Sequence, residues 1–177
     1  RGTLEIINKV KNYYYIDHGY FNQSKRSFEN KRTNVMNLDG YFRVVYNNLM
    51  HNGTGDYPED RFKKLNLKIH EQRNSGSYII LSEPSETMKQ VYNVPQWTID
   101  TKNLVKKFSD RKIIVHNKYS KEPLKNLLKN AWAFISLQST AGFAAMLNGI
   151  PSYFTDSHLS DIGKIEDIEN PKINYKI

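Results

Sequence analysis

The 177-residue chain contains no cysteine. The protein therefore has neither a disulfide framework nor thiolate ligands for a metal ion. The sequence also lacks an apolar run approaching the roughly 20 residues that a membrane-spanning helix needs, and no signal peptide is visible. We therefore expect a cytoplasmic protein without a membrane span. Because the sequence starts at Arg1 and ends in "NPKINYKI", we also expect it to be a fragment of a longer protein.

Acidic residues are fewer than basic ones, with 18 Asp and Glu against 26 Lys and Arg, so the formal net charge is +8. A basic surface favours anionic partners such as phosphorylated ligands, nucleic acid or anionic lipid. The lysines are spread along the chain instead of forming a stripe, which makes nucleic acid the less favoured partner. The alternative is that these lysines only keep the surface solvated.

The first 75 residues carry a weak pattern of elements. Residues 3–12 have apolar side chains at helical spacing, whereas 13–17 ("YYYID") and 40–49 ("GYFRVVYNNL") are typical of strands. The polar, turn-rich stretches 18–34 and 50–67 are interpreted as long loops. We interpret residues 1–75 as either the remnant of a preceding domain or the start of the sheet that follows.

From Gly76 onward, buried strands alternate with amphipathic helices. Strands are expected in "SYIILS", "KIIVHN", "AFISL" and "IPSYFT", and helices over 86–108 (broken near Pro95), 122–131 and 140–149. The two tryptophans are expected in the core or at an interface. This alternation predicts an α/β fold for residues 76–177, with a Rossmann-like parallel sheet flanked by helices.

Polar side chains follow the ends of the expected strands. Because ligands of such sheets bind beyond the carboxyl ends of the strands, we predict one polar cleft formed by these residues. The candidates are Asp17, His18, Ser82, Ser85, His116, Lys118, Gln138, Ser139, Thr140, Ala141 and Gly142. Asp156 and His158 also follow a strand, but no third ligand accompanies them, so no metal site is expected. The sequence indicates no cofactor.

The stretch "SLQSTAGFAAMLNGIP", residues 136–151, holds two of the 9 glycines of the chain. A helix N-terminus exposes unpaired N–H groups and a partial positive charge. Ser139 or Thr140 can cap it, and the remaining N–H groups can bind a phosphate if Ala141 and Gly142 let the ligand approach. The alternative is that Ser139 only caps the helix and that Gly142 lets it pack tightly on the sheet.

His18 is the candidate general base, with Asp17 to orient it; the alternative is a loop histidine bonded to backbone. Ser82 and Ser85 are candidates for binding phosphate or a nucleobase, although a turn next to Pro84 explains them equally. His116 and Lys118 are expected to add donors and positive charge. A non-catalytic binding module and a nucleic-acid-binding protein remain the competing classes.

The segment "STAGFAAMLNGIP" resembles the pattern S-x-x-G-F-E-A-L-x-x-G-x-P in the C-terminal domain of GT-B-type glycosyltransferases, especially those of capsular polysaccharide and Kdo transfer. It is also similar to nucleotide-sugar 2-epimerases. "RKIIVHNKYS" is similar to the preceding strand of those families, which ends in an Arg/Lys-Pro-His type of turn. "YYYIDHGYF" and "SDIGKIEDIENPKI" resemble uncharacterised phage and bacterial proteins. The similarity is strong over about 76–151.

The resemblance implies half of a GT-B architecture and transfer of a sugar from a nucleotide-activated donor. The partner would then be a nucleotide-sugar or another phosphorylated small molecule. The chain departs from the family pattern at two points. Ala144 stands where the transferases usually carry a glutamate, and the turn at 116–118 lacks their arginine. Both departures favour the alternative of a non-catalytic phosphate- or nucleotide-binding module.

Overall fold

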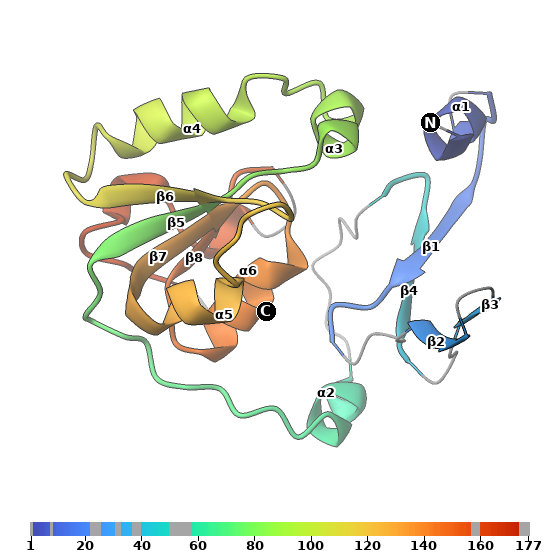
Figure 1. The fold of residues 1–177 in the computed structure, drawn as a ribbon, viewed down its shortest axis with the longest axis horizontal. Coiled ribbons are helices and arrows are strands. Elements are labelled where there is room, and N and C mark those ends of the chain that lie inside the picture. Colours follow the sequence, from blue (N-terminus) through green and yellow to red (C-terminus); the bar gives the residue numbers. More distant parts are fainter. Residues whose placement is uncertain are drawn as a thin grey trace. The chain divides into compact units, whose positions relative to one another are not determined.

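The computed structural model describes residues 2–7, 9–21, 26–30, 33–36, 40–49, 58–156 and 160–173. The chain divides into two compact units, Arg1–Leu67 and Lys68–Ile177 (Figure 1). The boundary predicted from the sequence lay eight residues later, between residues 75 and 76.

The C-terminal unit is built on a four-stranded parallel sheet in the order β6-β5-β7-β8. These strands are β5 (Tyr78–Ser82), β6 (Lys112–His116), β7 (Ala131–Ser136) and β8 (Ser152–Phe154). The helices are α3 (Glu86–Val91), α4 (Trp97–Val105), α5 (Leu124–Leu127) and α6 (Thr140–Leu147), and the 3-10 turns are η1 (Leu128–Asn130), η2 (Ser160–Ile162) and η3 (Ile165–Asp167). The prediction of a Rossmann-like α/β fold is confirmed.

The two faces of the sheet are covered by different helices, because successive side chains of a strand point to opposite faces. Ile79 and Leu81 pack in one cluster with Trp97 of α4 and Ile165 of η3. Ile80 packs in the other with Leu128 and with Ala145 of α6. Figure 1 shows α4 and α5 on opposite sides of the sheet. A strand buried on both faces needs the near-continuous apolar run from which β5 and β7 were predicted.

Helix boundaries follow local chemistry. The expected break near Pro95 is present, since α3 ends at Val91 and α4 begins at Trp97. The helix expected over 122–131 is shorter, because Pro123 is its extended N-cap and the chain tightens into η1 from Leu128. Both tryptophans are buried as expected; the Trp132 indole donates to the carbonyl of Ile168 at 2.7 Å.

Residues 68–77 form an extended segment that runs along the C-terminal unit (Figure 1). The amide of His70 donates to Leu147 O at 3.0 Å, and that of Arg73 donates to Gly149 O at 2.7 Å. The Arg73 guanidinium donates to the carbonyls of Leu128 and Lys129 at 2.8 and 2.6 Å. These hydrogen bonds explain why the boundary between the units precedes the segment.

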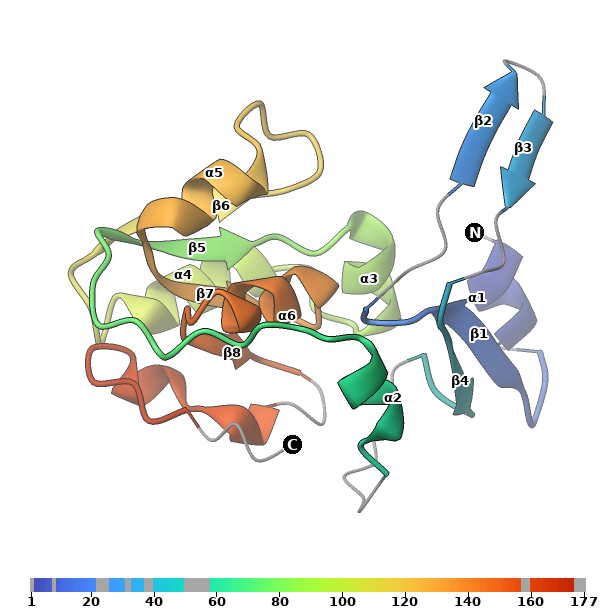
Figure 2. The same ribbon diagram turned by 90° about the horizontal axis from the view of Figure 1, so that it is seen from below.

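The N-terminal unit forms small antiparallel sheets of its own. β1 (Tyr14–His18) pairs with β4 (Phe42–Tyr46), and β2 (Arg26–Asn30) pairs with β3 (Thr33–Met36) (Figure 2). The short helices are α1 (Gly2–Ile7) and α2 (Asp60–Lys64). None of these strands joins the parallel sheet, so the interpretation of this region as the start of that sheet is wrong.

Two loop predictions in this unit are also wrong in part. The stretch 18–34 contains β2 and the start of β3, which pair with each other through their backbones. The sequence there is polar and has no alternating apolar pattern, so the strands were not predicted. The stretch 50–67 contains α2, where exposed ion pairs join Lys63 to Glu59 and Lys64 to Asp60. Residues 50–57 lie outside the described part of the chain.

Candidate functional site

The order of the strands reverses between β5 and β7. From β5 the chain moves to β6 on one side, and from β6 it crosses β5 to reach β7 on the other side. In open α/β sheets, ligands bind at the carboxyl ends of the strands where this reversal occurs. A cleft of about 180 Å³ lies there. Its lining residues come from just after β5 and just after β7 and are Ser82, Glu83, Pro84, Ser85, Met88, Leu137, Gln138 and Ser139.

Ser139 is the N-cap of α6, as predicted. Its backbone is extended, and its hydroxyl oxygen accepts the amide of Ala141 at 3.2 Å. The amide of Ser139 itself donates to the hydroxyl oxygen of Ser136 at 3.2 Å. The cap therefore fixes the start of α6 at the cleft, with the positive end of the helix dipole on this side.

Gly142 does not line the cleft, contrary to the prediction that it lets a phosphate approach. A Cβ atom at this position would lie 2.5 Å from the ring of Phe154. The missing side chain therefore serves the packing of α6 on β8, which was the alternative interpretation. Thr140 and Ala141 follow the cap in the first turn of α6 but also lie outside the cleft lining.

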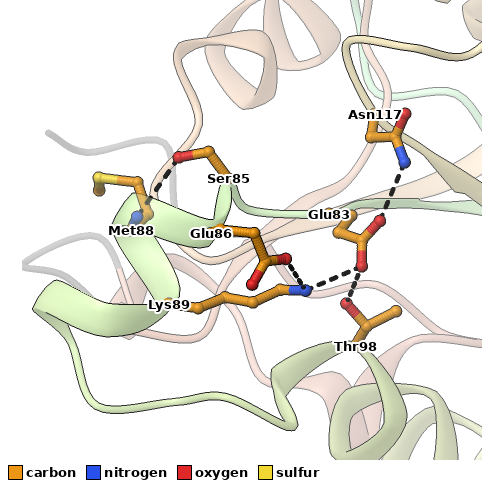
Figure 3. Close-up of polar contacts among 7 residues, drawn as sticks. All are labelled: Glu83, Ser85, Glu86, Met88, Lys89, Thr98 and Asn117. Carbon is orange, nitrogen blue, oxygen red and sulfur yellow. Dashed lines mark hydrogen bonds and ion pairs between the residues drawn. The ribbon is translucent and has the colours of Figure 1, made fainter.

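Glu83, which sequence reasoning did not select, is the centre of the polar network at the cleft (Figure 3). One carboxylate oxygen accepts the Lys89 ammonium at 3.1 Å and the Thr98 hydroxyl at 3.0 Å, and the other accepts the Asn117 amide at 2.9 Å. The bond from Asn117, then that from Lys89, lowers the pKa of Glu83 below its ordinary value. The carboxylate is therefore ionised at neutral pH. The position of Glu83 directly after β5 is the feature of the sequence that could have identified it as a site residue.

Lys89 is shared between that carboxylate and a second one. Its side chain is only 12% exposed and pairs with Glu86 at 2.9 Å as well as with Glu83. The hydrogen bonds to Glu86 and then to Glu83 raise the pKa of Lys89. Ser85 caps α3 by accepting the amide of Met88 at 3.3 Å. The wall of the cleft after β5 is thus rigid and carries fixed charges of both signs.

Gln138 has a different environment from these residues. It is 7% exposed and lines the cleft beside Ser139. Its side-chain oxygen is buried and accepts no hydrogen bond from the described residues. A buried polar atom of this kind is uncommon in native proteins and calls for an explanation.

His116 and Lys118 lie outside the cleft lining. The His116 ring nitrogen Nε2 is 3.1 Å from the carbonyl oxygen of Glu122, which turns the ring toward the loop before α5. The Lys118 ammonium lies over the ring of Tyr119, 4.9 Å from its centre, and the residue is exposed. In this arrangement neither residue supplies charge to the cleft, and the expectation that they do is not supported.

Asp17 and His18 belong to the N-terminal unit, at the end of β1. The Asp17 carboxylate accepts the Arg43 guanidinium at 2.9 Å and the backbone amide of His18 at 2.8 Å. The His18 ring stacks on Phe42, with 5.9 Å between ring centres. The role of His18 as a general base, and its place in the same cleft as Ser139, stay predictions because the two residues lie in separate units.

No group of three potential ligands among His, Asp and Glu that could hold a metal ion occurs in the described residues. His158 lies outside those residues. Within the same part of the chain, no helix is long and apolar enough to cross a membrane.

The site is thus a small cleft at the topological reversal of the sheet, with a capped helix start, an ionised carboxylate paired with a lysine, and a buried Gln138 oxygen that accepts no hydrogen bond from the described residues. Comparison of the chain with protein-family models, with curated proteins and with solved structures found no match.

Proposed function

We propose that the C-terminal unit binds the phosphorylated part of a nucleotide-activated sugar donor at the cleft between β5 and β7, and that the protein is glycosyltransferase-like. The observation that supports this best is that Ser139, the N-cap of α6, lines the cleft at the reversal of strand order. The positive end of the helix dipole favours an anion at such a point. In a transfer reaction this dipole would stabilise the charge developing on the leaving phosphate.

The volume of the cleft limits which part of a donor it can hold. Pockets that bury a drug-sized ligand measure roughly 300–1,000 Å³, whereas this one measures about 180 Å³. It fits one phosphate-sized group or a single sugar ring. The rest of a nucleotide-sugar would lie outside the cleft.

The charges at the cleft are compatible with an anion because Glu83 is paired. Lys89, which pairs with Glu86 as well, offsets part of the charge of the Glu83 carboxylate, so this carboxylate repels a phosphate less than an isolated one would. Three serines, Ser82, Ser85 and Ser139, line the same cleft. A hydroxyl can rotate to donate to a phosphate oxygen.

A non-catalytic phosphate- or nucleotide-binding module is the second candidate, and Ala144 favours it. This residue lies exposed on α6 and brings no carboxylate to the position where the transferases usually have glutamate. Release of the nucleoside diphosphate from a nucleotide-sugar in the presence of acceptors separates the two candidates. Binding without release would assign the module and exclude the transferase.

Calorimetric titration with uridine diphosphate tests the phosphate site itself. We expect the unmodified protein to bind and Ser139→Ala to bind more weakly. The substitution should lower the free energy of unfolding by only about 1 kcal/mol, the usual cost of a lost cap. Ser109→Ala is the control, because Ser109 also accepts a backbone amide, that of Arg111 at 3.1 Å, and in addition donates to Glu169, but precedes β6 at the opposite edge of the sheet. It should leave the affinity unchanged. No binding by the unmodified protein, or equal affinities for Ser139→Ala and the unmodified protein, would contradict the proposal.

A further inference from the structure

We infer that an exposed basic surface around Tyr119 binds single-stranded nucleic acid. This basic surface consists of the turn after β6 and the α5–η1 segment, residues 117–130. Its lysines would contact phosphates, and the Tyr119 ring would stack on a base. None of these residues lines the cleft between β5 and β7, so the role of the basic surface does not depend on the function proposed there.

The basic surface carries an excess of positive charge. Residues 117–130 contain one acidic residue, Glu122, whose carboxylate accepts the side-chain amide of Asn126 at 2.6 Å. They also contain four lysines, Lys118, Lys121, Lys125 and Lys129. All four are exposed, and none of them makes an ion pair with another described residue. Exposed cations without local partners favour a polyanion, which releases its own counterions on binding.

The packing of α5 and η1 directs these charges outward. The three leucines of this segment pack toward the core under it. Lys125 and Lys129 are four residues apart and so lie on one side of the segment, away from the leucines. Lys118 and Lys121 belong to the turn before α5, which projects beyond that helix (Figure 2). The lysines thus extend from the tip of the turn along the helical segment.

Tyr119 adds an aromatic ring at the tip of this turn. Its side chain is 80% exposed, and the Lys118 ammonium lies 4.9 Å from the centre of its ring. The backbone of the turn is fixed, because the amide of Tyr119 donates to the side-chain oxygen of Asn117 at 2.9 Å and the amide of Ser120 donates to Asn117 O at 3.0 Å. An exposed ring on an ordered turn can accept a stacked base without first ordering the chain.

The combination of charges and ring favours one class of polyanion. The sequence of the turn is "NKYSK" over residues 117–121, so Tyr119 has no apolar neighbour in the turn that could enter a bilayer with it. In a duplex the bases are stacked on one another, which leaves none free for the ring. Single-stranded nucleic acid offers both an anionic backbone and open base faces, the two features that lysines beside an aromatic ring recognise.

Fluorescence anisotropy of the full chain with a labelled single-stranded DNA of about 12 nucleotides tests the basic surface, since such sites span about 4–16 nucleotides. We expect the unmodified protein to bind this probe more tightly than its duplex. Tyr119→Ala should weaken binding at least about fivefold, the lower end of the contribution of one stacked base. Tyr119→Phe keeps the ring and should bind like the unmodified protein.

A pair of lysine substitutions tests the charge. For single strands, the slope of log K against log salt changes by about 0.7 for each phosphate contact. Lys125→Gln combined with Lys129→Gln should therefore make the slope shallower by about 1.4. The matched control is Lys102→Gln combined with Lys106→Gln, an exposed pair at the same spacing on α4 and its C-cap, on the other side of the sheet from α5 (Figure 1). It should leave the slope unchanged.

Every substituted side chain is exposed, so each variant should keep the melting temperature of the unmodified protein. No binding of the single-stranded probe, or equally tight binding of the duplex, would overturn the inference. Unchanged affinity of Tyr119→Ala, or equal losses from the two lysine pairs, would do the same. Binding to vesicles of anionic lipid with no binding to the probe would assign the basic surface to a membrane instead.

Discussion

The side-chain amide of Asn117 donates to the carboxylate of Glu83 at 2.9 Å and so connects the loop after β6 to the loop after β5. The backbone continues this connection, since the amide of Glu83 donates to His116 O at 2.9 Å. The two loops are therefore held together next to the cleft. A wall fixed in this way is the kind of support that a binding site needs if its polar groups are to be in place before the ligand arrives.

Asn117→Asp should destabilise the fold at neutral pH. The side-chain oxygen of Asn117 accepts the amide of Tyr119 at 2.9 Å, and aspartate keeps that acceptor. It loses the donor to Glu83 and places two carboxylates side by side. We expect a loss of about 1–2 kcal/mol at pH 7, measured by urea unfolding, and a smaller loss near pH 4 where the carboxylates take up protons. A variant as stable as the unmodified protein at pH 7 would show that the bond contributes nothing.

Glu83→Gln should change how stability depends on pH. The pKa of Glu83 is lowered in the folded state, chiefly by Asn117 and then by Lys89. A lowered pKa contributes stability above the unfolded-state value of about 4.3, and the contribution is lost as the pH falls through the folded-state value. The difference in melting temperature between the two proteins should therefore be largest near pH 7 and shrink below about pH 4.

The control for this measurement is Glu166→Gln, because Glu166 is exposed in η3 and makes no ion pair among the described residues. Its effect on the melting temperature should be small at every pH. A constant difference between Glu83→Gln and the unmodified protein from pH 7 to pH 3 would contradict the explanation by a lowered pKa.

The sequence predicted the parallel sheet well because its two central strands, β5 and β7, are buried on both faces. The runs that became these strands are almost entirely apolar, as a strand covered on both faces requires. The cap at Ser139 was also predictable, since a hydroxyl before a run of small helix-forming residues has a strong local preference. Local chemistry was sufficient in both cases.

The pairings at the cleft were not predictable, because they join residues far apart in the sequence. Nothing near Glu83 indicates that Asn117 and Thr98 will donate to its carboxylate. His116 ends a strand and Lys118 follows it, as ligand-binding residues do, yet their side chains turn to Glu122 and Tyr119. Strand order determines which loops meet at an edge, but the rotamers determine which side chains enter the cleft.

Gly142→Ala should destabilise the fold through Phe154. The added Cβ atom would lie 2.5 Å from one ring atom and 2.6 Å from another, and Phe154 is buried. Forcing a methyl group into such a space costs about 1–3 kcal/mol. Calorimetric melting of the single variants and of Gly142→Ala with Phe154→Leu tests the cause. The second substitution makes room, so the double variant should be more stable than the sum of the two single losses; simple additivity would exclude the clash.

Arg73→Ala tests where the C-terminal unit begins. The guanidinium of Arg73 donates to the carbonyls of Leu128 and Lys129, the first two residues of η1. Hydrogen bonds from charged groups stabilise by about 1.5–3 kcal/mol when buried; one of these two is exposed to water, so we expect a loss of about 1–2 kcal/mol in urea unfolding. Lys68→Ala is the control, because Lys68 lies exposed in the same segment. If the two variants are equally stable, residues 68–75 contribute little to the unit, and a boundary between residues 75 and 76 describes the chain better than one after Leu67.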